Sequence, residues 1–268
     1  MLIVPKPLNS FSGVAYNSKA SMSLAVGPTY NEIQLHTNLT AEQVSLVSVI
    51  LNGDSIVQVS GADLKIMEGY KENPDGTGVF VIPFTNPNAK NQQGAMHGGL
   101  VTLAGEGVTL EVEIGAGVGE TPPTPMLDAV AFLSPAQAER IWLPRIRTHT
   151  MQANAVGWND FTTFPAKDTN YIKRAYFKGA VTRLKVERDN LILFDVKKAV
   201  QEFQQKRVRR KPQAGVYVFD PTMYGFEAAD ALNTGYRSEF VFRVEASSVG
   251  AIPILVESVE QVGGFATK

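Results

Sequence analysis

The segment TGVFVIPF at residues 77–84 returns in altered form 137 residues later, as AGVYVFDP at residues 214–221. Each copy has the pattern of a short apolar strand that starts after a glycine. Each also ends at a proline, Pro83 or Pro221, which cannot donate a hydrogen bond to a strand ladder. If the repeat is not accidental, the segments around the two copies correspond in the same order.

The segments upstream of the two copies do correspond. Each is a β-rich run with a tight break at its middle, VSVILNGDSIVQVS at 47–60 and VTRLKVERDNLILFD at 181–195. The first break is Asn52-Gly53, the dipeptide that best fits a type I′ turn, and the second is Asp189-Asn190. The sequence therefore predicts a β-hairpin at the same place in each half.

A helical pattern follows each predicted hairpin. Ser60 and Asp63 form a capping-box pattern in the first copy, and Asp195 is placed to cap a helix in the second. The apolar residues with helical spacing are Leu64, Met67 and Tyr70 in the first copy and Val196, Val200 and Phe203 in the second. This spacing predicts one amphipathic helix per copy.

Further segments match on both sides of this unit. The pairs are IVPKP at 3–7 with WLPRI at 142–146, GPTYNEIQL at 27–35 with DTNYIKRAY at 168–176, TLEVEIGAG at 109–117 with EFVFRVEAS at 239–247, and PMLDAVAFL at 125–133 with PILVESVEQ at 253–261. Their offsets run from 128 to 141 residues, which loop insertions explain. We infer a tandem duplication with one domain over residues 1–136 and another over 137–268.

Each predicted domain holds roughly eight short strands and one inserted helix. Helices do not alternate with the strands, which argues against Rossmann and TIM-barrel folds. Eight antiparallel strands in two sheets make a jelly roll. The predicted fold class is mainly β, with two tandem eight-stranded jelly-roll barrels that each carry a short helix.

The residue content argues against several kinds of chemistry. The chain has no cysteine, so disulfides, thiolate nucleophiles and cysteine-ligated metals are excluded. GxSxG, Walker and HExxH motifs are absent. His36, His97 and His149 lack the spacing of a shared metal site and are interpreted as ordinary surface or strand residues. We expect no enzymatic activity, no secretion signal and no membrane-spanning helix.

The charge of the chain is divided unequally between the two halves. Residues 1–136 have a net charge of -7 and residues 137–268 a net charge of +6. Such an asymmetry indicates either a half that binds nucleic acid or two halves that lie beside each other.

Several of these segments resemble a known family. GPTYNEIQLHTN at 27–38, VSVILNGDSIVQVSGADLKIMEGY at 47–70 and GVFVIPF at 78–84 look like the N-terminal barrel of the major capsid protein of corticoviruses, tailless marine bacteriophages with an internal membrane. AVTRLKVERDNLILFD at 180–195 is similar to the C-terminal barrel. The resemblance implies a double jelly roll, pseudo-hexagonal trimers and an icosahedral shell over a lipid bilayer. It also implies penton and minor capsid or membrane proteins as partners, assembly into the virion capsid after synthesis in the host cytoplasm, and no specific binding of nucleic acid.

Symmetry leads to the same arrangement. A hexagonal tile needs six barrels, so three chains of two fused barrels close it when barrel one of each chain meets barrel two of the next. The opposite charges of the halves would make every such contact complementary. A ring held in this way is expected to loosen at high salt.

A basic run follows the second predicted helix, in QQKRVRRKPQ at 204–213. Its cations are Lys206, Arg207, Arg209, Arg210 and Lys211. They suit a solvated loop at a helix C-terminus, a contact with the acidic half of a neighbouring subunit, or a contact with lipid phosphate or DNA. The sequence leaves these three interpretations open.

The loop after the first predicted helix offers oxygen ligands. Asn73 and Asp75, followed by Gly76-Thr77-Gly78, are weak candidates for a calcium site, although Asn-Pro-Asp-Gly is also a common turn sequence. We expect no required cofactor. The resemblance adds structural calcium as a candidate without naming its ligands.

These observations favour a structural protein that acts by self-assembly. The alternative is a tandem jelly-roll protein that binds carbohydrate, such as a receptor-binding spike. A bicupin enzyme is disfavoured because cupin metal sites normally use clustered histidines, and this chain has three scattered ones.

Overall fold

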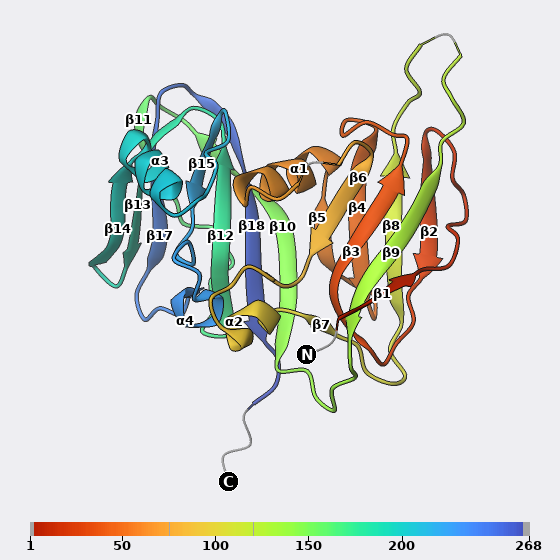
Figure 1. The fold of residues 1–268 in the computed structure, drawn as a ribbon. Coiled ribbons are helices and arrows are strands. Elements are labelled where there is room, and N and C mark those ends of the chain that lie inside the picture. The colour runs from red at the N-terminus through yellow and green to blue at the C-terminus, as the bar shows by residue number, and fades with distance from the viewer. Residues whose placement is uncertain (1–2, 75, 120, 265–268) are drawn as a thin grey trace.

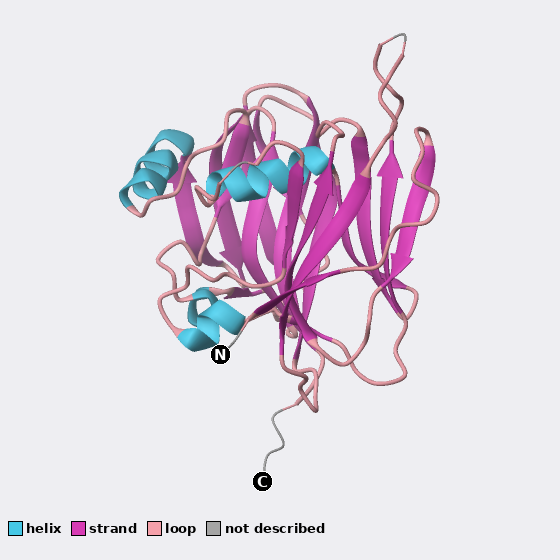
Figure 2. Ribbon diagram, turned by 45° about the vertical axis from the view of Figure 1, so that its right-hand side comes forward, coloured by secondary structure: helices cyan, strands magenta, loops and turns pink. Residues whose placement is uncertain are grey.

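The structure, a computed structural model, describes residues 3–74, 76–119 and 121–264. Strands dominate it and form two bodies side by side, the N-terminal half on the right of Figure 1 and the C-terminal half on the left. The helix over residues 61–70 lies between the two bodies, and the other helices lie at the outside of the strand layers (Figures 1 and 2). Among the described residues, none of the helices is long and apolar enough to span a bilayer.

The first sheet lies wholly in the N-terminal half. In spatial order its strands are β1 (Val4–Pro7), β9 (Leu127–Ser134), β3 (Thr29–Thr37) and β6 (Val79–Pro83), with β7 (Leu100–Val101) beside β3. All neighbours are antiparallel. β1 forms one edge of this sheet, and its side chains are exposed.

The second sheet runs through both halves. Its N-terminal strands are β2 (Ser18–Ser23), β8 (Val108–Ile114), β4 (Val44–Leu51) and β5 (Asp54–Val59). It continues with β10 (Trp142–Ala153), β18 (Gly250–Gln261), β12 (Asn170–Lys178) and β15 (Val216–Phe219), and β16 (Leu232–Asn233) pairs with β12. The junction of β5 and β10 is parallel, with Val57 opposite Ile146 and Gln58 opposite Arg147. One continuous sheet therefore joins the two halves.

The third sheet lies in the C-terminal half. Its order is β11 (Gly157–Phe161), β17 (Phe240–Ala246), β13 (Val181–Arg188) and β14 (Leu191–Lys197). The order β1-β9-β3-β6 thus recurs as β10-β18-β12-β15, and β2-β8-β4-β5 recurs as β11-β17-β13-β14. Each half is an eight-stranded jelly roll, so the predicted fold class is confirmed. We call the unit of β1 to β9 barrel one and the unit of β10 to β18 barrel two.

Both predicted hairpin turns are present. Asn52 and Gly53 have φ values of 51° and 87°, and Asp189 and Asn190 have 51° and 65°. Two successive residues with positive φ define the type I′ turn, which matches the twist of the flanking strands. Asn, Asp and Gly tolerate this conformation better than other residues, so the sequence determined the turns directly.

The first predicted helix forms as expected. α1 (Gly61–Tyr70) starts with a complete capping box, in which the Asp63 backbone N–H donates to Ser60 Oγ at 3.1 Å. Its apolar residues Leu64, Met67 and Tyr70 are fully buried. Two short helices, α2 (Gln92–Met96) and α4 (Glu227–Asp230), precede β7 and β16.

The prediction for the second helix was wrong in its start and in its buried face. β14 continues to Lys197, so Asp195 lies in the strand and binds Arg183 instead of capping α3 (Lys198–Arg207). The residues of α3 that face its own barrel are Gln201 and Gln205, which both donate to the Val218 carbonyl oxygen. Val200 and Phe203 are 53% and 61% exposed. The apolar stripe of α3 therefore points away from barrel two.

The matched segments lie on corresponding strands of the two barrels. We call two residues equivalent when they have the same position in the strand ladders of the two barrels. From Asn52 to Pro83 the offset of 137 residues holds throughout, but the strand ladders shift the four outer alignments by one to three residues. The ladders make Glu32 equivalent to Arg174 and Phe132 equivalent to Glu257, and β3 and β12 carry a bulge at the same ladder position. Sequence comparison missed these shifts because short apolar segments of β-strands resemble one another in more than one register.

Each barrel has a hydrophobic core, and the core of barrel one extends beyond it. The core of barrel two is rich in phenylalanine, including Phe161, Phe164, Phe177, Phe240 and Phe242. The core of barrel one also contains residues of barrel two, namely Leu143, Ile146, Tyr176, Val216, Val218 and Leu255. Ile146, Tyr176, Val216, Val218 and Leu255 lie on one face of the second sheet, the face that points toward α1.

Candidate functional site

The two barrels meet at the inter-barrel seam, where α1 and the β4–β5 hairpin of barrel one meet β10, β12, β15 and β18 of barrel two. α1 lies between the two strand bodies in Figure 1. Its Leu64, Met67 and Tyr70 belong to the same apolar cluster as Tyr176 and Leu255 of barrel two. Burying such side chains contributes roughly 1.5 to 3 kcal/mol each, so the apolar seam joins the barrels firmly.

A charged network lies beside the apolar part of the seam. Arg174 on β12 is fully buried. Its guanidinium binds Asp220 and Glu257 at 3.3 Å each, donates to Thr222 at 2.9 Å, and also binds Glu227. One cation surrounded by three carboxylates is compatible with burial because each acid retains a partner.

Three residues of barrel one complete this network, and one of them is Asn86, whose carboxamide donates to Glu227 at 2.5 Å. The Tyr70 hydroxyl donates to Asp220 at 3.0 Å, and Lys71 Nζ lies 3.4 Å from a carboxylate oxygen of Glu257. The Tyr70 ring meets the Tyr176 ring edge-on at 5.7 Å. The C-terminal end of α1 is therefore tied to barrel two by charge, hydroxyl and aromatic contacts together.

The network keeps Glu257 and Glu227 ionised. Burial alone would raise the pKa of Glu257, but Lys71 and Arg174 lower it to about 2. Burial likewise opposes ionisation of Glu227, whose pKa Arg174 and Lys173 hold well below its usual range. Burial and the adjacent Glu257 raise the pKa of the Tyr176 hydroxyl, so this tyrosine remains a hydrogen-bond donor. The seam therefore consists of fixed charges rather than of groups poised for proton transfer.

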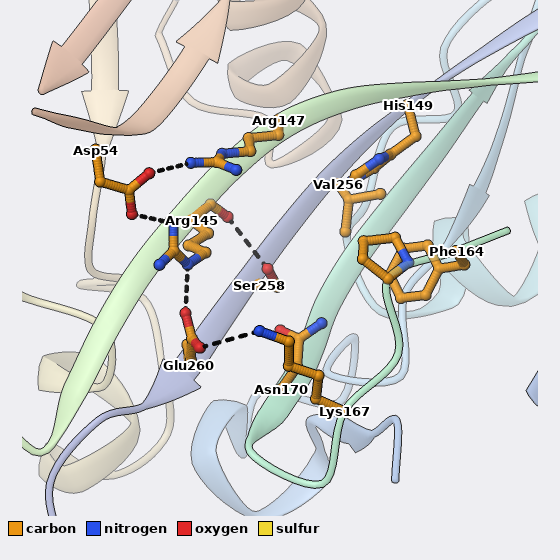
Figure 3. Close-up of a pocket in the computed structure, with 11 residues that line it drawn as sticks. Asp54, Arg145, Arg147, His149, Phe164, Lys167, Asn170, Val256, Ser258 and Glu260 are labelled. Carbon is orange, nitrogen blue, oxygen red and sulfur yellow. Dashed lines mark hydrogen bonds and ion pairs between the residues drawn. The ribbon is translucent and has the colours of Figure 1, made fainter. Parts of the chain in front are cut away.

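A second set of charges surrounds a hollow of about 230 Å³ at the other side of the sheet (Figure 3). Asp54, from the hairpin of barrel one, lies between Arg145 and Arg147 at 2.8 Å and 2.7 Å. Arg145 also binds Glu260 at 2.5 Å. Figure 3 shows His149 near Phe164 on the far side of the hollow, and their rings are 5.5 Å apart.

Ion pairs across the seam run mostly in one direction. Cations of residues 137–268 bind acids of residues 1–136 in Arg140–Glu106, Arg145–Asp54, Arg147–Asp54 and Lys178–Asp63. Lys71–Glu257 runs the other way. Part of the charge asymmetry seen in the sequence is therefore used inside the chain.

The three histidines lie apart. His36 is exposed on β3 and His149 lies on β10, as expected, but His97 is 6% exposed at the end of α2, which corrects its interpretation as a surface or strand residue. Its ring meets Trp142 at 5.0 Å, and Trp142 meets Tyr171 of barrel two at 5.3 Å. Burial, followed by the nearby Lys173, lowers the pKa of His97 to about 4.

The basic run does not act as one patch. Lys206, Arg207, Arg209 and Lys211 are exposed, whereas Arg210 is buried at 7% exposure. Arg207 and Arg209 line a hollow of about 640 Å³ between the barrels, together with Lys71 and Lys90. Lys211 donates its backbone N–H to the Tyr70 carbonyl oxygen, which fixes the run against the end of α1.

The structure describes one of the two candidate calcium ligands, Asn73. The Asn73 carboxamide oxygen accepts a hydrogen bond from Asn88 at 3.4 Å, and its nitrogen donates to Glu68 at 2.8 Å. Asp75 lies outside the described residues. Within the described ranges, no three His, Asp or Glu side chains gather closely enough to hold a metal ion.

The seam residues supply cohesion between two jelly rolls, and this combination defines a double jelly-roll coat protein. Two family models match consecutive parts of the chain, the N-terminal domain of viral coat protein P2 over residues 5–134 and its C-terminal domain over residues 143–262. The chain belongs to the viral coat protein P2 family. It is a structural protein of the virion capsid and not an enzyme, as the sequence predicted.

Solved structures agree with this assignment. The major capsid protein P2 from bacteriophage PM2 is 21% identical with a TM-score of 0.87, covering 98% of this chain and 100% of that one. The STIV MCP is 10% identical with a TM-score of 0.68, covering 98% of each chain. The PBCV-1 virus capsid is 12% identical with a TM-score of 0.66, covering 100% and 97%. At these identities the structures support the fold. No curated protein matches the chain.

The sequence did not reveal the central residue of the seam. Arg174 and Lys173 lie in NYIKRAYFK, residues 170–178, where two cations interrupt an apolar strand. Glu257 interrupts the apolar run of β18 in the same way and pairs with Arg174 across the ladder. Charges of opposite sign inside two adjacent apolar strands were the available signal.

Proposed function

We propose that three copies of this coat protein close into a pseudo-hexagonal trimer, and that such trimers tile an icosahedral shell over an internal lipid membrane. The observation that carries the proposal is the seam itself. It joins the β5 edge of barrel one to the β10 edge of barrel two, and the equivalent edge strands, β14 and β1, lie far apart in one chain (Figure 1). A heterologous contact of this kind repeats from chain to chain until the ring closes.

In this proposal the ring units are residues 1–136 and residues 137–268. The two matched family domains, 5–134 and 143–262, support a division between them. β9 ends at Ser134 and β10 begins at Trp142, so the proposed boundary falls in the connection between the last strand of barrel one and the first strand of barrel two.

The exposed cations of the basic run take a contact role in the shell. Lys206, Arg207, Arg209 and Lys211 suit a neighbouring subunit or lipid headgroups, and the burial of Arg210 assigns that residue to the fold instead. Replacing the four exposed cations with glutamine, while leaving Arg210 intact, separates the two contacts. Loss of trimer indicates a subunit contact, and loss of vesicle binding with trimer intact indicates a lipid contact.

The remaining partners come from the resemblance. Penton proteins would occupy the vertices, and minor capsid or membrane proteins would link the shell to the bilayer. Structural calcium is included without assigned ligands, since Asn73 already uses its carboxamide and Asp75 lies outside the described residues. A melting temperature that does not change with chelator would remove calcium from the proposal.

The mass of the purified protein in solution tests the proposed ring. Light scattering is expected to give three times the 29.1 kDa of the chain, or a larger assembly built from such units. A 29.1 kDa monomer at all concentrations, especially one that binds glycans, would contradict the trimer and favour a receptor-binding spike.

A further inference from the structure

Barrel one has an outer sheet face equivalent to the face of barrel two that α1 covers. Val79, Val81 and Val130 are equivalent to Val216, Val218 and Leu255, as the ladders of the two sheets show. The three residues of barrel two are buried at 5%, 2% and 0% exposure. Their equivalents in barrel one are half-buried. Barrel one therefore presents a sheet face with apolar residues on β6 and β9, and with Glu32, Gln34 and His36 of β3 between them.

α3 presents an apolar face of its own. Val200 is equivalent to Asp63, and Phe203 is equivalent to Ile66, which packs against the core of barrel one. In α1 these positions lie at the seam, where Asp63 binds Lys178 at 2.6 Å. In α3 they are exposed. α3 thus exposes apolar residues at positions that belong to the seam in α1. It covers no sheet of barrel one in its own chain, because barrel one lies beyond α1 (Figure 1).

For two ion pairs of the seam, both charged residues have an apolar residue at the equivalent position of the other barrel. The pair Lys71–Glu257, 3.4 Å apart, is equivalent to Val208 and Phe132. The pair Arg145–Asp54, 2.8 Å apart, is equivalent to Val4 and Leu191. If only one residue of such a pair were apolar, a charge would be buried against an apolar group. Because both residues are apolar, the two surfaces that would carry them stay complementary.

We propose that the α3 face of one copy docks on the β9 face of a second copy, with the geometry of the inter-barrel seam. The α3 face consists of Val200, Phe203 and Val208, and the β9 face consists of Val79, Val81, Val130 and Phe132. Leu191 of β14 and Val4 of β1, which points to the opposite side of the sheet from Phe132, extend the contact at the strand edges. In this arrangement Val208 meets Phe132 and Leu191 meets Val4. Arg207, equivalent to Tyr70, lies near Glu32, equivalent to Arg174. The docking surface rests on the proposed trimer and specifies which residues close it.

The proposed surface changes the expected response to salt. The net charges of the halves predicted a ring that loosens at high salt. An apolar contact is not screened, and salts such as sulfate strengthen it. We therefore expect the trimer to persist at high salt, although the charges of the barrels still favour encounter of unlike barrels.

Phe203→Asp tests the α3 face. Because Phe203 is exposed, the variant is expected to fold with an unchanged melting transition of the monomer but to associate at least 100-fold more weakly. Val249→Asp is the matched control, since Val249 is 63% exposed in the turn between β17 and β18 and lies outside both faces. This control should remain a trimer.

Thiol cross-linking tests the pairing directly, since the chain has no cysteine of its own. Val4→Cys combined with Leu191→Cys should give dimers and trimers with a short bis-maleimide, and no larger species, because the ring is closed. These residues lie on β1 and β14, which are far apart in one chain (Figure 1), so a link between them joins two chains. The equivalent pair within the seam, Arg145→Cys with Asp54→Cys, should link inside one chain and leave a monomer on a denaturing gel.

The outcomes separate this inference from the proposed function. A trimeric wild type with the expected cross-links and a dissociated Phe203→Asp variant supports both. If the wild type is trimeric but the Val4–Leu191 pair does not cross-link and Phe203→Asp stays trimeric, the docking surface is wrong and the proposed function stands. A wild type that stays monomeric overturns the trimer and this surface with it.

Discussion

Barrel one and barrel two share a strand order, but their inserted helices lie in different surroundings. α1 buries Leu64, Met67 and Tyr70 between the barrels, whereas α3 buries two glutamines and exposes Val200 and Phe203. The same contrast holds around the sheets, where Arg174 in barrel two is equivalent to the half-buried Glu32 in barrel one. Equivalent positions have diverged according to the neighbour they face, one within the chain and one outside it.

The contrast shows how one chain can keep two similar contacts distinct. The seam inside the chain combines apolar burial with ion pairs, and the proposed contact between chains replaces two of those pairs with apolar ones. A helix that met the wrong sheet would bury an unpaired charge, for example Lys71 against Phe132. Such a mismatch costs several kcal/mol, enough to direct each helix to its own partner.

The largest expected effect comes from Arg174. Arg174→Met removes the cation from three buried carboxylates, so we expect the free energy of unfolding to fall by about 3 to 5 kcal/mol or more. Denaturant unfolding at fixed protein concentration measures it. Glu32→Gln, at the equivalent position in barrel one, should change stability by less than about 1 kcal/mol. Equal losses in the two variants would erase the contrast between the barrels.

The second prediction compares the helix cores. Leu64→Ala removes a fully buried side chain of α1 and should cost about 2 to 5 kcal/mol. Its equivalent in α3 is Gln201, whose partner, the Val218 carbonyl oxygen, also accepts from Gln205. Gln201→Ala should therefore cost only about 1 kcal/mol. Thermal unfolding of both variants gives the ranking, and a reversed order would show that α1 is not the main wedge.

The third prediction concerns how the stability of the protein depends on pH. His97 lies before β7 in barrel one, and the corresponding segment before β16 in barrel two has no histidine. The folded protein holds the pKa of His97 at about 4, below its ordinary value of 6.5, so protonation favours the unfolded chain. Stability is complete above pH 6.5 and falls by up to about 3 kcal/mol as the pH drops to 4.

His97→Gln cannot titrate and should show a shallower loss of stability over that pH range. His36→Gln is the matched control, because it replaces an exposed histidine on β3 in the same way. Unfolding curves measured from pH 7 to pH 5 avoid most carboxylate titration. An identical slope for the wild type and His97→Gln would show that His97 does not sense pH.

The smallest expected effect concerns the helix caps. Ser60→Ala removes the capping box of α1 and should cost about 1 kcal/mol. Lys197, at the equivalent position before α3, makes no side-chain cap bond, so Lys197→Ala should stay within about 0.5 kcal/mol of the wild type. A loss as large for Lys197→Ala would mean that the two caps are not as different as the hydrogen bonds indicate.

Local signals in the sequence predicted a large part of the fold. Asn52-Gly53 and Asp189-Asn190 placed both hairpins, Ser60 with Asp63 placed the start of α1, and the repeated order of segments gave two jelly rolls. These signals are short-range, because a turn or a cap depends on a few adjacent residues. Such features can be read from one sequence without knowledge of their neighbours.

The features that were missed depend on distant partners. Val200 and Phe203 have the spacing of a core stripe, but spacing does not say which body covers the stripe. Arg174 looks like an exposed strand residue until three acids from other elements surround it. The exact equivalence of strand residues, such as Glu32 with Arg174, depends on the pairing of each strand with its neighbours and not on the strand's own apolar pattern.

The central claim is that both contacts of a barrel ring use the same geometry, one inside the chain and one between chains. Electron cryomicroscopy of the assembled protein tests it most directly. The account predicts six barrels in a ring, with α3 of each copy lying on β9, β3 and β6 of the next copy, as α1 lies on β18, β12 and β15. A ring in which α3 faces solvent, or in which barrel one meets barrel one, would contradict it.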